Sequence, residues 1–114
     1  QTRAAHAAVL YTSKFDFLAA AEDVGRHNAL DKVIGKMFLD RKMGQAALLT
    51  LSSRISYELV QKAARARIPI ILAISRPTAL AVKLAADLNI TLASLADGPG
   101  LYVFCAAQRL VDSI

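Results

Sequence analysis

The sequence contains a single cysteine, Cys105, among its 114 residues. One thiol excludes an internal disulfide, and it excludes the Cys-x-x-Cys pairs that bind metals or carry redox chemistry. This usage suits a reducing compartment, and we expect the protein to be cytoplasmic. Because Cys105 lies among apolar residues of a predicted strand, we expect it to be a buried and unreactive thiol.

Long apolar runs are also missing. No apolar stretch approaches the roughly 20 residues of a membrane-spanning helix. Residues 1–10 lack the charged start and apolar stretch of a signal peptide, so we expect no export. The sequence also has no internal repeat, low-complexity segment or interdomain linker. We therefore expect residues 1–114 to form one domain.

The overall composition is that of a folded and basic protein. Hydrophobic residues make up 55% of it and charged residues 20%, enough for a single core. The net charge of +5 and the isoelectric point near 9.7 favour an anionic partner. The basic residues are scattered rather than clustered, which favours a phosphorylated small molecule over nucleic acid.

Hydrophobic periodicity predicts an alternation of strands and helices. Strands are predicted at 6–11, 15–20, 46–51, 69–74, 90–95 and 101–106, and helices at 28–41, 56–67 and 77–88. This order favours an α/β fold, a three-layer α/β/α sandwich with a mixed, mostly parallel sheet and right-handed crossovers.

Polar side chains follow four of the predicted strands. They lie at 22–28, 52–54, 75–76 and 97–98. Open α/β sheets bind ligands beyond the carboxyl ends of their strands. The sequence therefore predicts a binding site at that edge of the sheet.

The first cluster precedes a helix and includes Gly25, Arg26, His27 and Asn28. Glycine allows a turn or a close approach to a ligand, and free N–H groups at a helix start attract anions. Arg26 is interpreted as a phosphate ligand, or alternatively as an ion-pair partner of a neighbouring acidic residue, Glu22 or Asp23. His27 is interpreted either as a helix cap or as a ligand-binding residue. A role for His27 as a general base is disfavoured because no nucleophile is evident.

The next two clusters also lie at helix starts. An arginine at a helix start opposes the dipole, so Arg54 is interpreted as an anion ligand. Ser53 and Ser56 suit helix capping and ligand binding equally. Ser75 and Thr78 are expected mainly to cap the following helix and, as a secondary role, to contact ligand.

These clusters carry a resemblance to a known family. The segment 22–28, with Asp31-Lys32-Val33-Ile34-Gly35, resembles the signature of the FdhD/NarQ family, the formate dehydrogenase accessory sulfurtransferases. Further similar segments are 52–58, 61–63, 75–78, 80–82, 92–104 and 108–110. The resemblance spans almost the whole chain but only the C-terminal part of the family's length. The family's conserved cysteine pair lies upstream of the residues present.

The family is similar in fold to cytidine deaminases, which bind zinc through His-x-Glu and Cys-x-x-Cys at two helix starts. Here the second helix start reads Ser53-Arg54-Ile55-Ser56. Neutral hydroxyls are poor zinc ligands, so we expect no metal and disfavour a residual deaminase.

The resemblance implies a sulfur carrier or sulfurtransferase in molybdenum cofactor biosynthesis. It implies transfer of sulfur from a cysteine desulfurase to the molybdenum cofactor, a bis(molybdopterin guanine dinucleotide), for formate dehydrogenase. GDP would mimic part of that cofactor. The alternative is a guanine-nucleotide or cofactor-binding module that acts as a chaperone without chemistry. A homodimer is compatible with the sequence.

The resemblance also implies cofactor binding by an aromatic-x-Arg-x-x-Arg stretch, which corresponds to Leu95 to Gly100. This chain departs from the pattern at Leu95, Asp97 and Gly100, and Arg76 is a candidate to compensate. The residues predicted to bind cofactor are Gly25, Arg26, His27, Asn28, Ser53, Arg54, Ser56, Ser75, Arg76, Thr78, Leu95, Ala96, Asp97, Gly98, Pro99 and Gly100.

Overall fold

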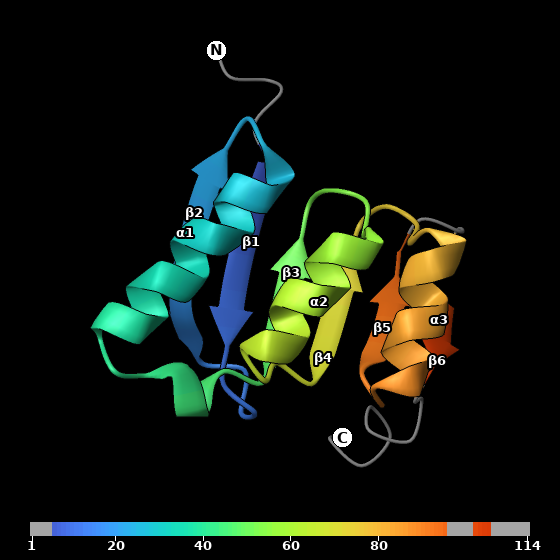
Figure 1. Ribbon diagram of the computed structural model, residues 1–114. Helices are drawn as coiled ribbons and strands as arrows, with labels where there is room; N and C mark the ends of the chain where they lie inside the picture. Colours follow the sequence, from blue (N-terminus) through green and yellow to red (C-terminus); the bar gives the residue numbers. More distant parts are fainter. Residues whose placement is uncertain (1–5, 96–101, 106–114) are drawn as a thin grey trace.

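The computed structural model describes residues 6–95 and 102–105, which form one mixed sheet with helices packed against it (Figure 1). The elements follow the predicted order. They are β1 (His6–Tyr11), β2 (Phe17–Asp23), α1 (Arg26–Leu39), the short 3₁₀ helix η1 (Met43–Gln45), β3 (Leu48–Leu51), α2 (Tyr57–Arg65), β4 (Ile70–Ala73), α3 (Ala79–Asp87), β5 (Thr91–Ser94) and β6 (Tyr102–Cys105).

The second strand lies further along the chain than predicted. The turn after β1 is longer because the N–H of Thr12 donates to the carbonyl of Asp16 at 2.9 Å, with Phe15 in the left-handed region at a φ of 67°. As a result β2 starts at Phe17 and extends to Asp23. The acidic residues Glu22 and Asp23 therefore belong to the strand end and not to the loop.

The sheet has the order β2-β1-β3-β4-β5-β6 and is mixed, as predicted. The central strands β3, β4 and β5 are parallel, whereas β1 is antiparallel to both of its neighbours and β6 is antiparallel to β5. The parallel part is therefore the centre of the sheet, and antiparallel pairs flank it. Consequently β2, β3, β4 and β5 all end at the same edge (Figure 1).

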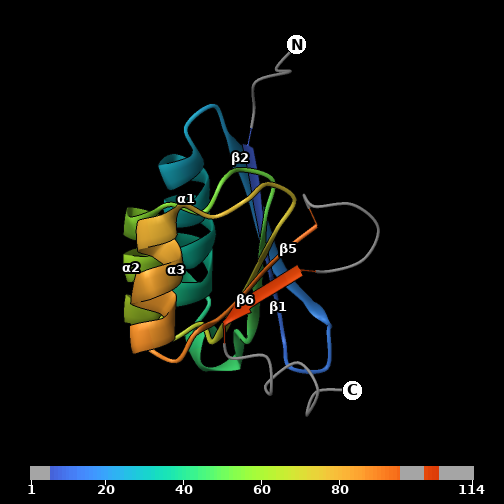
Figure 2. The same cartoon turned by 90° about the vertical axis from the view of Figure 1, so that its right-hand side faces the viewer.

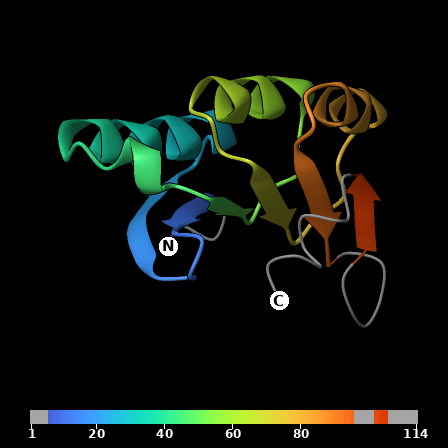
Figure 3. The same cartoon turned by 90° about the horizontal axis from the view of Figure 1, so that it is seen from below.

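Among the described residues, all three helices lie on one face of the sheet (Figures 2 and 3). These residues form two layers, whereas the sequence predicted three. The physical reason is the strand order. The parallel strands β2, β3, β4 and β5 follow one another across the sheet in one direction, so connections of one hand place α1, α2 and α3 on the same side.

The core lies between the helices and this face of the sheet. Its fully buried side chains include Leu30, Val33 and Met37 from α1 and Leu59 and Val60 from α2. Helical spacing groups Phe38 with the apolar face of α1, but it is exposed because Met37 occupies the inward position of that turn. No helix in the described part of the chain is long and apolar enough to cross a membrane.

The edge strand β2 is covered by lysines from α1. Lys36 Nζ donates to the carbonyl of Ala20 at 2.5 Å, and Lys32 Nζ donates to that of Glu22 at 3.1 Å. Exposed edge carbonyls invite pairing with another chain, and charged side chains oppose it. These lysines therefore protect the edge of the sheet.

Candidate functional site

Three helices begin at the edge where the parallel strands end. The chain passes from β2 into α1, from β3 into α2 and from β4 into α3, and the helix starts lie along the top of Figure 1. The predicted clusters at 22–28, 52–54 and 75–76 are therefore brought to one edge. Of the last predicted stretch, Leu95 to Gly100, the residues from Ala96 onward lie outside the described residues, and Leu95 is exposed.

The start of α1 has no side-chain cap. Gly25 is its N-cap residue, no side chain accepts from the first turn, and that turn contains no acidic residue. The φ of Gly25 is −98°, so a left-handed backbone does not require the glycine. A Cβ there would instead lie 3.2 Å from the Asn28 amide nitrogen. The first N–H groups of α1 are thus available to an anion.

Asp23 organises the loop before α1. Its carboxylate accepts from the Gly25 N–H at 2.9 Å and from the Asn28 amide at 3.4 Å, and it pairs with Lys32 Nζ at 2.7 Å. The hydrogen bond from Gly25, with that from Lys32, lowers the pKa of Asp23 from 3.8 to about 2. The predicted site residue Asn28 is therefore held by Asp23, a contact that the sequence pattern did not predict for either residue.

We expect Asp23→Asn to lower the melting temperature at neutral pH, with a difference from wild type that shrinks in acid. The native pKa lies below the ordinary value, so the ionised carboxylate stabilises the fold above about pH 4. This contribution is lost as the pH falls through about 2. Thermal melting of both proteins across that range measures the effect. A difference that stays constant with pH would contradict the role of this carboxylate.

Arg26 and Arg54 are exposed and form no ion pair within the described residues. The alternative in which Arg26 pairs with an acidic neighbour is wrong for Asp23, because Asp23 pairs with Lys32. The ion pair between Asp23 and Lys32, which are nine residues apart, connects the end of β2 to the second turn of α1. No local periodicity signals such a contact.

The pKa of His27 lies below its ordinary value, which favours the neutral imidazole. Burial lowers its pKa, and the positive charges of Lys62 and Arg26 lower it further against the opposing effect of Glu58 and Asp31. A neutral imidazole offers one donor and one acceptor. A bound phosphate would favour the protonated form.

The hydroxyls at the other two helix starts act as caps. Ser56 accepts from the Leu59 N–H at 3.3 Å, and Thr78 accepts from the Ala81 N–H at 3.1 Å. Ser53 is buried and donates to the carbonyl of Arg54 at 3.1 Å. The predicted capping roles of Ser56 and Thr78 are thus confirmed, whereas Ser53 and Ser75 are not the N-cap residues of these helices. The contacts of all four residues with ligand remain predictions.

The second and third loops are tied together and to the sheet. The Thr78 N–H donates to the carbonyl of Ile55 at 2.9 Å, within a bridge between Ile55 and Pro77. The buried hydroxyl of Ser94 donates to the carbonyl of Ser75 at 3.0 Å. These bonds fix the loops that carry Arg54 and Arg76, while both arginines stay exposed.

In the described part of the chain, no group of three His, Cys, Asp or Glu side chains is placed to bind a metal. We expect elemental analysis of the purified protein to find less than one zinc per chain, because hydroxyls replace the thiolates that zinc prefers. The control is the same analysis after dialysis against a chelator. Stoichiometric zinc that is lost on His27→Ala would overturn this prediction.

Comparison with known proteins places these features in a family. A model of the FdhD/NarQ family matches residues 1–111. The chain is 42% identical to the sulfur carrier protein FdhD of Agrobacterium fabrum over 97% of its own length and 41% of the relative. It is 45% identical to the FdhD protein of Mycobacterium bovis over 96% of this chain and 40% of the relative.

A solved structure agrees with this assignment. The crystal structure of a protein from Desulfotalea psychrophila, described as a formate dehydrogenase accessory protein, has a TM-score of 0.85 and 35% identity to this chain. The similarity covers 96% of this chain and 48% of the other. The chain thus spans less than half the length of the relatives described, and by sequence and fold it belongs to the FdhD/NarQ family.

Proposed function

We propose that this chain is the cofactor-binding domain of a sulfur carrier protein. The complete protein would receive sulfur from a cysteine desulfurase and pass it to the bis(molybdopterin guanine dinucleotide) form of the molybdenum cofactor for formate dehydrogenase. The names of the relatives from Agrobacterium fabrum and Mycobacterium bovis support the sulfur carrier role. The similarity to the accessory protein from Desulfotalea psychrophila supports the link to formate dehydrogenase. We propose the cytoplasm as its location.

The uncapped start of α1 carries this proposal. It offers free N–H groups beside Arg26, and the loop before α2, at the same edge of the sheet, carries Arg54. Neither arginine forms an ion pair among the described residues. Pyrophosphate is an anion that such groups bind through charge-assisted hydrogen bonds. The cofactor here is cargo, and this chain's part is to bind its phosphates and orient it.

Cys105 is a poor candidate for the sulfur-carrying thiol. It is half-buried, where full burial was expected, and its thiol donates to the carbonyl of Ile90 at 3.2 Å. Burial raises the pKa of the thiol. Since the thiolate is the nucleophile, this environment disfavours persulfide formation.

We expect no persulfide on Cys105 when the chain is incubated with a cysteine desulfurase and cysteine. Intact-mass spectrometry would detect the addition of one sulfur atom, with the desulfurase's own persulfide as the positive control and Cys105→Ser as the blank. A persulfide on Cys105 that is passed to an acceptor would show that this chain carries sulfur by itself.

A non-catalytic chaperone that binds the cofactor is the second candidate, because the described residues contain no reactive thiol. A chimera distinguishes the two functions. The matching part of the Agrobacterium fabrum relative is replaced by this chain, and formate dehydrogenase activity is measured in cells that lack their own FdhD. Rescue that needs the upstream cysteines supports the sulfur carrier. Rescue without them supports the chaperone, and no rescue by a folded chimera contradicts both.

A further inference from the structure

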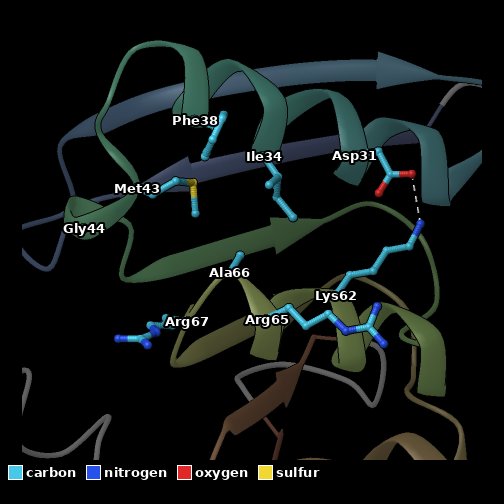
Figure 4. Close-up of a pocket in the computed structure, with 9 residues that line it drawn as sticks. All are labelled: Asp31, Ile34, Phe38, Met43, Gly44, Lys62, Arg65, Ala66 and Arg67. Carbon is cyan, nitrogen blue, oxygen red and sulfur yellow. Dashed lines mark hydrogen bonds and ion pairs between the residues drawn. The ribbon is translucent and has the colours of Figure 1, made fainter.

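A groove lies between α1, η1 and the C-terminal half of α2, away from the helix starts (Figure 4). Its volume is about 610 Å³. Ile34, Phe38 and Met43 form its apolar part, and Lys62, Arg65 and Arg67 lie on the opposite side. Lys62 pairs with Asp31 across one end at 3.0 Å, which joins the two helices there.

One apolar side chain of the groove is unusually exposed. Phe38 is 74% exposed, whereas Ile34 and Met43 are half-buried. Exposed aromatic and aliphatic side chains that are gathered beside a groove mark binding surfaces, whereas scattered ones do not. Phe38 and Ile34 are one helical turn apart, so they present a continuous apolar strip.

The opposite side of the groove is basic. Arg65 and Arg67 are exposed and have no carboxylate partner among the described residues. The dipole of α2 favours a cation such as Arg65 at its C-terminal end. It does not explain Arg67, which has a φ of 60° at the position after a helix where glycine is the usual residue.

We propose that this groove binds an acidic peptide segment of a partner protein. Apolar side chains of the peptide would contact Phe38, Ile34 and Met43, and its carboxylates would pair with Arg65 and Arg67. A second copy of this chain fits less well, because a two-fold contact would bring the basic sides together. Nucleic acid would leave the apolar strip unused. The proposal is independent of the anion site, which lies at the other end of the helices.

A peptide-display library of about a dozen random positions tests the proposal without assuming a sequence. The wild-type chain is the bait, and the double variant Arg65→Ala/Arg67→Ala is used for counter-selection. We expect enrichment of peptides that combine Asp or Glu with Leu or Phe. Enrichment of basic peptides, or no enrichment over the double variant, would overturn the proposal.

The best peptide is then measured by fluorescence anisotropy. We expect Phe38→Ser and the double arginine variant each to weaken binding about tenfold or more. Leu80→Ser and Lys83→Ala, exposed positions on α3, are matched controls that should bind as wild type does. Equal binding by Phe38→Ser, or a dimer in sedimentation that Phe38→Ser abolishes, would contradict a peptide site.

Arg67→Gly separates binding from stability. Glycine adopts the left-handed conformation without strain, so we expect the melting temperature of the variant to be a few degrees above that of the wild type. Peptide binding should nevertheless weaken. A variant that is more stable and binds the peptide as well as wild type would show that Arg67 has no part in the groove.

Discussion

Replacing Arg26 or Arg54 by Ala is expected to weaken binding of GDP about tenfold or more, and replacing both about a hundredfold. A charge-assisted hydrogen bond contributes about 1.5–3 kcal/mol, and about 1.4 kcal/mol is a factor of ten in affinity. Both side chains are exposed and form no ion pair among the described residues, so each is available to phosphate. Calorimetric titration of GDP into each variant measures the loss.

Thermal melting is the control for this result. The melting temperature should hardly change, because neither arginine contributes to the core. Lys83→Ala removes an exposed positive charge from the middle of α3, outside the predicted clusters, and should bind GDP as wild type does. If both arginine variants bind GDP normally, the anion site is not at this edge of the sheet.

Replacing Ile71 by Ala is expected to destabilise the fold by about 2–5 kcal/mol, a large part of the roughly 5–15 kcal/mol that holds a domain together. Ile71 is fully buried at the centre of the sheet, in register with Leu49 on β3 and Leu92 on β5. Its truncation leaves a cavity where the helices pack on the parallel strands.

Urea unfolding of the wild type and of Ile71→Ala measures the difference in the free energy of unfolding directly. Ile74→Ala is a matched control, because Ile74 is the same residue type, three positions along the chain and 61% exposed. We expect it to cost less than about 0.5 kcal/mol. Equal losses at the two positions would mean that β4 does not lie at the centre of the core.

The sequence was sufficient to predict which loops form the candidate site. Polar residues that follow strands lie at one edge of the sheet whenever those strands run in the same direction. The strands β2, β3, β4 and β5 do so, and only β1, which lies between β2 and β3 in the sheet, runs the other way among them. The partners of each side chain could not be predicted. Asp23 pairs with Lys32 and not with Arg26, because the strand end and the second turn of α1 meet only after the helix has packed.

Phe38 shows the same limit. Helical spacing groups it with Val33 and Met37, but a helix buries only the arc that meets the sheet. The orientation of α1 is set by its packing on β1 and β2, which the spacing of apolar residues within the helix does not specify. The groove beside α2 therefore could not be read from the periodicity of either helix.

The sequence by itself determined the order of strands and helices, the α/β class and the clustering of polar loops, since each depends on local periodicity and on the polarity of the chain. The tertiary structure alone decided that the helices of the described residues share one face. It also decided which arginines lack ion-pair partners among those residues, and where an apolar and basic groove forms. Those features arise from contacts between segments far apart in the chain, whose geometry depends on strand order, crossover handedness and packing.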